Sequence, residues 1–178
     1  MNGATYALGF VNFGVHWASE YRVEVFLMKA LIVYDSVYGN TEKIARAIAG
    51  ALASSGEAKV LGAGEVNPSE LESVDLLIVG SPTQGGRPTP AIKELLNKIP
   101  ANALKNVSVA SFYTRFSTRL VGILGYAAGK IAGSLKTKGG TLILSPEALF
   151  VKSKEGPLKD GELERAAVWA KGILESKK

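Results

Sequence analysis

The chain has 178 residues, a length that fits one domain with a single hydrophobic core. Its composition, 47% hydrophobic and 21% charged, is that of an ordinary globular protein and excludes fibrous, collagen-like and disordered chains. The formal net charge is +5 at pH 7, and because the charged residues of segment 1–28 sum to −1, the remainder of the chain is basic. The Lys and Arg residues are scattered without interleaved aromatics, which favours a solvated surface over a nucleic-acid partner.

Two residue types that carry much enzyme chemistry are scarce. Cysteine is absent and histidine occurs once, at His16, which excludes disulfides, thiolate metal sites and a Ser-His-Asp triad in the main domain. No stretch is long and apolar enough to predict a membrane span, and residues 1–28 lack the basic start and compact apolar centre of a signal peptide. We therefore predict a cytoplasmic protein without a metal site, whose redox chemistry, if any, requires a bound cofactor.

The first 28 residues differ from the rest of the chain. They hold six aromatic residues with no clear period, and Met28 stands directly before the first convincing strand. We interpret residues 1–28 as an N-terminal extension and residues 29–178 as the folded domain. The alternative is an added strand or an arm that docks on a partner.

From Lys29 onward, short apolar runs alternate with helical patterns, which predicts repeated βαβ units around a parallel sheet. Strands are predicted at residues 29–35, 58–63, 74–80, 107–112 and 141–144. Helices are predicted at residues 41–53, 88–99, 120–135 and 161–174. The apolar stripes assign to the cores of the last two helices Leu120, Leu124, Ala127, Ile131 and Leu135, and Leu163, Ala167, Ala170 and Leu174. The fold class is α/β with three layers.

In open α/β sheets, ligands bind beyond the carboxyl ends of the strands, so the loops that follow the first, third and fourth strands are the candidates. The first is Ser36-Val37-Tyr38-Gly39-Asn40-Thr41, at the start of a helix. Free N–H groups and the helix dipole bind a phosphate there without a lysine. The chain has no Gly-Lys-Ser/Thr tripeptide, which argues against ATP and GTP. The alternative is that Ser36, Asn40 and Thr41 only cap the helix.

The other two loops offer walls for a flat ligand. The second contains Ser81-Pro82-Thr83-Gln84 followed by Gly85-Gly86, where the backbone can approach a ring closely. The third begins Tyr113-Thr114-Arg115-Phe116, with aromatics for stacking and a guanidinium for a negative group. The alternatives are an ordinary Gly-Pro loop for the second, and core aromatics with surface arginines for the third.

These residues resemble the flavodoxin family: a strand ending Tyr34-Asp35, the 36–41 loop, Gly80-Ser-Pro-Thr83 with Gly85-Gly86, and the turn 112–115. The resemblance covers about residues 29 to 175, and the tail Lys154-Glu-Gly-Pro-Leu158 is similar to short prokaryotic members. It implies a five-stranded parallel sheet of order 2-1-3-4-5 with helices on both faces. It also implies FMN bound non-covalently by Ser36, Val37, Tyr38, Gly39, Asn40, Thr41, Ser81, Pro82, Thr83, Gln84, Gly85, Gly86, Tyr113, Thr114, Arg115 and Phe116. The sequence departs from the family pattern at Gln84, where an aromatic is common, and in its basic third turn.

The resemblance implies an electron-transfer protein in which FMN does the redox chemistry and the protein sets its potential. Arginines near the ring predict a less negative potential than in an acidic flavodoxin. The alternative is an NAD(P)H-dependent quinone or flavin reductase, an FMN-dependent oxidoreductase in which Arg87, Arg115 or Arg119 would bind the nucleotide phosphate. The expected partner is accordingly a redox protein, or NAD(P)H with a quinone. A flavin-binding regulator stays open, whereas the acidic residues of a receiver domain are missing after the first and third strands.

Overall fold

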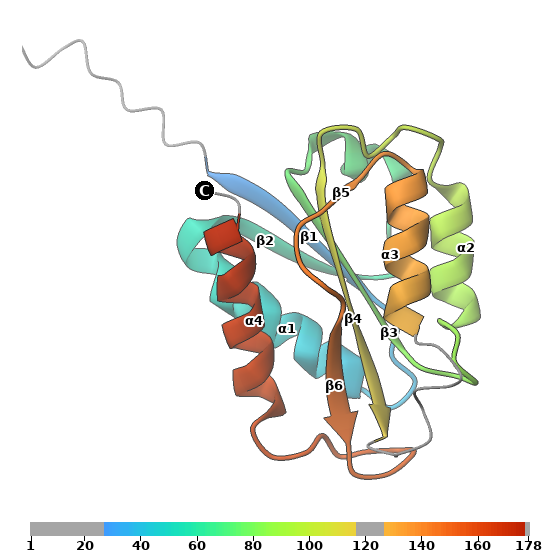
Figure 1. Cartoon of the computed structure of the whole chain (residues 1–178), viewed down its shortest axis with the longest axis vertical. Helices are drawn as coiled ribbons and strands as arrows, with labels where there is room; N and C mark the ends of the chain where they lie inside the picture. Colours follow the sequence, from blue (N-terminus) through green and yellow to red (C-terminus); the bar gives the residue numbers. More distant parts are fainter. Residues whose placement is uncertain (1–26, 117–126, 177–178) are drawn as a thin grey trace, which may run out of the picture.

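A computed structural model describes residues 27–116 and 127–176 of the chain. Within these residues, strands and helices alternate as the apolar pattern predicts (Figure 1). None of the described helices is long and apolar enough to cross a membrane. The strands are β1 Met28–Tyr34, β2 Gly56–Gly62, β3 Leu76–Pro82, β4 Ser108–Phe116, β5 Thr141–Leu142 and β6 Glu147–Val151. The helices are α1 Asn40–Leu52, α2 Pro90–Lys98, α3 Ala127–Thr137 and α4 Glu162–Ser176, with short 3-10 turns η1 Ala53–Ser55 and η2 Pro68–Ser73.

The sheet is parallel and has the order β2-β1-β3-β4-β5, which confirms the predicted topology. The prediction of a single fifth strand is wrong, because two separate strands, β5 and β6, pair with successive parts of β4. β5 pairs with Ser108 and Val109, and β6 pairs with residues 112–116. Pro146 lies between the two strands, and a proline has no N–H to donate to a ladder.

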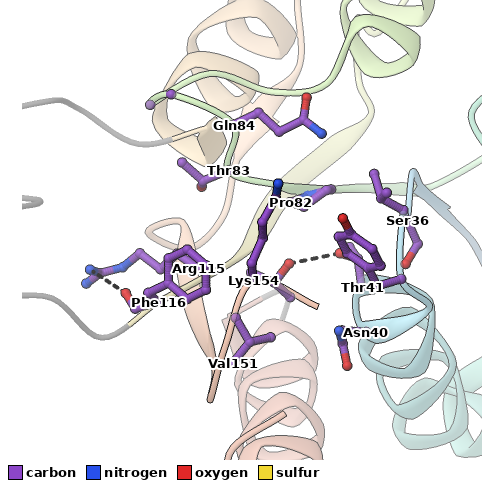
Figure 2. A pocket seen from close by; sticks show the side chains of 15 residues that line it. Ser36, Asn40, Thr41, Pro82, Thr83, Gln84, Arg115, Phe116, Val151 and Lys154 are labelled. Carbon is purple, nitrogen blue, oxygen red and sulfur yellow. Dashed lines mark hydrogen bonds between the residues drawn. The ribbon is translucent and has the colours of Figure 1, made fainter. Parts of the chain in front are cut away.

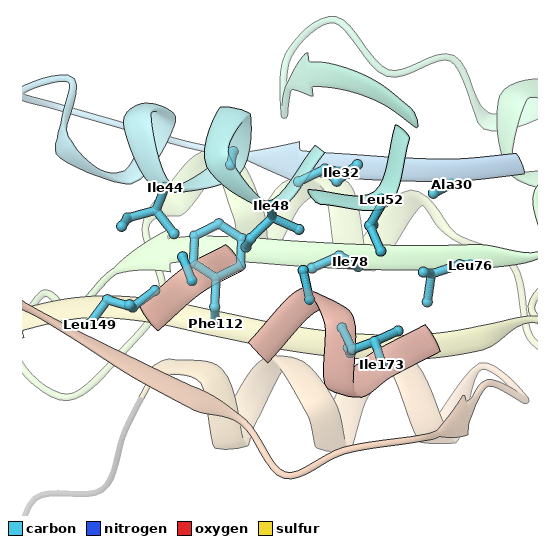
Figure 3. Packing of buried hydrophobic residues seen from close by; sticks show 14 residues of the cluster. Ala30, Ile32, Ile44, Ile48, Leu52, Leu76, Ile78, Phe112, Leu149 and Ile173 are labelled. Atoms are coloured by element: carbon cyan, nitrogen blue, oxygen red, sulfur yellow. The ribbon is translucent and has the colours of Figure 1, made fainter. Parts of the chain in front are cut away.

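Helices cover both faces of the sheet, as predicted. On one face α1 and α4 pack against alternate residues of the strands, among them Leu76 and Ile78 (Figure 3). On the other face the intervening residues Leu77 and Val79 pack against α2 and α3. All four of these β3 residues are buried, which explains why the central strand reads as an unbroken apolar run.

Gly80 in β3 lies directly against the ring of Phe112 in β4. A Cβ at this position would lie 2.0 Å from Cζ of Phe112, whose ring makes an edge contact with Trp169 at 6.5 Å between centroids. No side chain fits there without moving the ring. The position therefore holds β3 and β4 in their observed packing, just before both strands reach their carboxyl ends.

The predicted inward face of α4 is partly wrong. Ala170 is buried as expected, but Leu163 is 41% exposed and its neighbour Glu162 is buried instead. The carboxylate of Glu162 accepts a hydrogen bond from the backbone N–H of Phe150 at 2.9 Å and is paired with Arg165. These polar contacts of Glu162 turn the first turn of the helix so that Leu163 faces outward.

In α3 the predicted stripe is confirmed at Ala127, Ile131 and Leu135, which are all buried. Leu120 and Leu124 lie outside the described residues, as does residue range 1–26 with its alternative roles.

Candidate functional site

A cavity of about 560 Å³ opens at the carboxyl edge of β1, β3 and β4 (Figure 2). The first two of the three loops predicted to bind a ligand, the end of β4, the end of β6 and the turn after β6 all contribute to its walls. Thirteen of the sixteen predicted site residues line it: Ser36, Val37, Tyr38, Asn40, Thr41, Pro82, Thr83, Gln84, Gly85, Gly86, Thr114, Arg115 and Phe116. Gly39, Ser81 and Tyr113 do not line it, while Val151 and Lys154 do and were not predicted.

The N-terminus of α1 faces this cavity without a side-chain cap. Gly39 is the N-cap residue, and no side chain of residues 27–116 or 127–176 caps the helix there, so the alternative in which Ser36, Asn40 and Thr41 serve as caps is wrong. The first helical hydrogen bond runs from Lys43 N–H to Gly39 C=O at 3.1 Å. The N–H groups of the three residues before Lys43 therefore have no carbonyl of their own helix to bind. Together with the positive end of the helix dipole, they form a site for an anion.

Two hydroxyl groups of the cavity walls are buried without a hydrogen-bond partner among the described residues. They are Ser36 Oγ in the first loop and Thr83 Oγ1 in the second. A buried hydroxyl without a partner costs free energy, on the order of 1–3 kcal/mol. Both residues line the same cavity, so a ligand with polar oxygens can supply the missing partners.

The side chains of Asn40 and Thr41 tie the start of α1 to other parts of the site. Asn40 Nδ2 donates to the backbone carbonyl of Glu155 at 2.9 Å. The hydroxyls of Thr41 and Thr114 are hydrogen-bonded to each other at 2.9 Å in buried surroundings, which joins α1 to the end of β4 (Figure 2). These contacts fix the geometry of the anion site rather than leaving it to a mobile loop.

The second loop is held by backbone hydrogen bonds and by Ser81. The buried hydroxyl of Ser81 accepts a hydrogen bond from Thr89 N–H at 3.0 Å and donates to the carbonyl of Pro82, which accounts for its absence from the cavity wall. Gln84 and Arg87 then exchange backbone hydrogen bonds of 2.9 and 3.0 Å across a tight turn. The two central glycines of this turn have φ of 54° and 73°, as a type I′ turn requires.

The third predicted loop is wrong as a loop, because Tyr113 to Phe116 belong to β4. Tyr113 and Thr114 pair with Ser81 and Pro82 of β3 on one side, and residues 112–116 pair with β6 on the other. Tyr113 is buried against Ala127 and Ala128 of α3, as the alternative of a core aromatic proposed.

Arg115 and Phe116 lie at the rim of the cavity. The Arg115 guanidinium is stacked 4.9 Å from the centre of the Phe150 ring, and its side chain points away from the start of α1 (Figure 2). Phe116 is 41% exposed. Arg119, the third arginine considered for a nucleotide phosphate, lies outside the described residues, and Arg87 lines a different groove.

Lys154 is the cation that the sequence analysis missed. It lies on the turn after β6, and its side chain extends into the cavity toward Pro82 (Figure 2). The turn is closed by a hydrogen bond from Lys152 N–H to Pro157 C=O at 2.8 Å and is tied to Asn40 through Glu155. Gly156, with φ of 108°, lies so close to Asn40 that a Cβ would come within 2.5 Å of its Nδ2. The motif Lys154-Glu-Gly-Pro is visible in the sequence, but its place beside the cavity follows only from strand β6, which the sequence pattern did not predict.

Two charged side chains shift each other's pKa behind the first turn of α1. The hydrogen bond from Arg46 at 2.7 Å holds the pKa of the Glu42 carboxyl below its usual range. The pKa of the Tyr34 hydroxyl is raised, mainly by burial and to a smaller extent by the negative charge of Glu42. Among the described residues, no group of three or more acidic or histidine side chains is placed to hold a metal ion.

Comparisons with known proteins agree with this geometry. The family model for flavodoxins matches residues 32–169. Flavodoxin 1 from Bacillus cereus superposes with a TM-score of 0.70 at 21% identity, over 83% of this chain and 97% of that one. A flavodoxin from the domain Archaea gives a TM-score of 0.67 at 23% identity, over 85% and 100% of the two chains.

A larger protein shares the same fold over part of its length. For rubredoxin oxygen:oxidoreductase from Desulfovibrio gigas, the TM-score is 0.66 at 22% identity, over 83% of this chain but 35% of that one. No protein with a curated description matches the sequence. The structural matches establish the fold, and the family model covers well over half of the chain: the protein belongs to the flavodoxin family.

Proposed function

We propose that this chain is an electron carrier that holds FMN in the cavity at the carboxyl edge of its sheet. FMN is the cofactor of the flavodoxin family and therefore of this chain. The observation that carries the placement is the uncapped N-terminus of α1, which faces the same cavity as two buried hydroxyls that have no partner within the described residues. The cavity volume of about 560 Å³ lies within the range usual for cofactor and ligand pockets.

The donors at the start of α1 fit the phosphate end of FMN. A phosphate monoester is an anion that accepts several hydrogen bonds, and the free N–H groups from Asn40 onward, with Ser36 Oγ, supply donors for it. Residues 36–41 contain no cation, so the helix dipole provides most of the local positive potential. Lys154 adds one positive charge from the turn after β6.

The remaining walls fit the flavin ring. The Gln84–Arg87 turn presents backbone at Gly85 and Gly86, and Thr83 presents a hydroxyl that has no partner in the part of the chain that the structure describes. Tyr38 and Phe116, which are 45% and 41% exposed, stand at the rim as candidates for stacking. When bound, FMN accepts and donates electrons at this ring, while the protein orients it and excludes water from part of its surface.

The reductase alternative has weaker support than the carrier. A reductase needs a site for the nicotinamide nucleotide next to the flavin, with a cation for its phosphate. Arg87 does not line the cavity but the groove on the other side of the Gln84–Arg87 turn, and the Arg115 guanidinium lies over the Phe150 ring. The cytoplasmic location, one-electron or two-electron chemistry and the N-terminal extension at residues 1–28 stay predictions.

The test is an absorbance spectrum of the purified protein after incubation with FMN and desalting, followed by stepwise photoreduction. Retained flavin that is reduced in two resolved steps is expected for a one-electron carrier. NAD(P)H consumption with a quinone acceptor is then measured on the same sample, and no turnover above free FMN is expected. A folded protein that retains no flavin would contradict the proposal, and rapid turnover of NAD(P)H would replace the carrier with a reductase.

A further inference from the structure

The positive charge of the domain is concentrated on one of its two helical layers. The helices α1 and α4 carry four acidic and four basic residues, so their charges cancel. The helices α2 and α3, side by side on the other face of the sheet (Figure 1), carry four lysines against the single acid Glu94. Glu94 is paired with Lys98 of its own helix at 2.8 Å. The remaining positive charge of this layer is therefore not neutralised by its own acids.

Three cations line one open groove on this layer. The groove has a volume of about 480 Å³ and is bounded by the segment before α2, by α2 and by α3. Arg87, Lys93 and Lys130 contribute its charges, and the other lining residues are uncharged. All three cations are exposed, and none forms an ion pair within the part of the chain that the structure describes. Pro88 and Leu96, which are both buried, also line the groove.

The groove adjoins the cofactor cavity through a single turn. Gln84, Gly85 and Gly86 line the cavity, and the next residue, Arg87, lines the groove. The backbone hydrogen bonds between Gln84 and Arg87 make this turn a fixed partition between the two. A molecule seated in the groove is therefore placed next to the second wall of the flavin site.

We propose that this groove docks an acidic face of a redox partner protein, so that the redox centre of the partner comes close to the flavin. The inference rests on the proposed function as an electron carrier. Complementary charge accelerates encounter and fixes orientation, which a carrier with short-lived complexes needs. A protein suits the surface better than a membrane does, because the protruding side chains of a protein can enter a concave groove, whereas lipid head groups form a flat layer.

Charge reversal in the groove tests the docking. The FMN-loaded full chain is photoreduced and mixed in a stopped-flow instrument with an acidic blue-copper protein or with a basic c-type cytochrome, both one-electron acceptors. Lys93→Glu and Lys130→Glu alter the groove, and Lys171→Glu, on the exposed surface of α4, makes the same charge change on the other layer. Retained FMN and an unchanged thermal unfolding curve establish that each variant is folded.

At low ionic strength we expect each groove variant to lower the second-order rate constant with the acidic acceptor by about 3- to 10-fold. The rate with the basic acceptor should rise, Lys171→Glu should have little effect on either rate, and high salt should remove the differences. Equal effects of Lys93→Glu, Lys130→Glu and Lys171→Glu would overturn the docking site, because net charge alone would explain them.

Two further outcomes are separable from these. Groove-dependent binding to vesicles that contain anionic lipid, without a groove effect on the acidic acceptor, would assign the surface to a membrane and overturn the proposal. Loss of FMN from the unaltered chain would overturn the proposed function itself. With FMN retained and reducible, a failure of the groove variants to differ from Lys171→Glu removes the docking inference alone.

Discussion

Replacing Ser36 by alanine tests the phosphate end of the cofactor site most directly. Ser36 Oγ is buried and has no hydrogen-bond partner among the described residues, so Ser36→Ala removes no contact of the folded chain. The stability of the protein without FMN should therefore be unchanged or slightly higher. In the proposed complex with FMN, the hydroxyl would donate to a charged phosphate oxygen, and such hydrogen bonds contribute about 1.5–3 kcal/mol. This corresponds to about 10- to 150-fold weaker FMN binding.

Riboflavin has the flavin ring of FMN but no phosphate, so comparing the two ligands distinguishes an effect on phosphate binding from an effect on ring binding. The dissociation constants of FMN and of riboflavin are measured by quenching of flavin fluorescence, for the unaltered chain, for Ser36→Ala and for Ser54→Ala. Ser54 lies exposed in η1 beyond the other end of α1 and serves as the control. Of these six dissociation constants, only that of Ser36→Ala for FMN should be raised. Equal weakening of FMN and riboflavin, or of neither, would refute the placement of the phosphate beside Ser36.

Three further changes test other parts of the structure. Lys154→Met removes one of the two cations that line the cavity and keeps a side chain of similar length, so we expect the flavin potential to become more negative by about 40 mV, equivalent to roughly 1 kcal/mol for one electron. An unchanged potential in a spectroelectrochemical titration would place the ammonium group away from the ring. Gly80→Ala puts a Cβ 2.0 Å from the ring of Phe112 and should lower the free energy of unfolding, measured in urea, by about 1–3 kcal/mol. The control Gly133→Ala, in open space on α3, should leave the free energy of unfolding unchanged or raise it. Because Arg46 lowers the pKa of Glu42, the Glu42 carboxylate stabilises the fold above its ordinary pKa, and this contribution is lost as the pH falls through the lowered value. The free energy of unfolding of Glu42→Gln should thus fall less steeply than that of the unaltered chain between about pH 5 and about pH 3, and equal slopes for the two proteins would count against the pair.

The order of elements and the first two walls of the site could be predicted from the sequence because their signals are local. Buried parallel strands such as β3 are continuous apolar runs, and the phosphate loop is a short motif between a strand and a helix. The helical stripes follow from the 3.6-residue period alone.

The missed features depend on partners that lie far along the chain. Glu147–Val151 becomes strand β6 because it pairs with the end of β4, more than 30 residues earlier in the sequence. The same pairing turns Tyr113 to Phe116 from a predicted loop into a strand, and it places Lys154 at the cavity. Leu163 faces outward because Glu162 binds the backbone of Phe150, a contact that periodicity does not encode.

The two edges of the sheet differ in construction, and both discourage the addition of a strand from another molecule. On one edge, the interruption at Pro146 leaves β5 with two residues and β6 with five, so neither offers a long unpaired backbone. On the other edge, β2 carries the exposed charges of Glu57 and Lys59, and Lys59 is paired with Glu70. Within the described residues, the sheet therefore presents no long, uncharged edge as a template for aggregation, although its interior strands are strongly apolar.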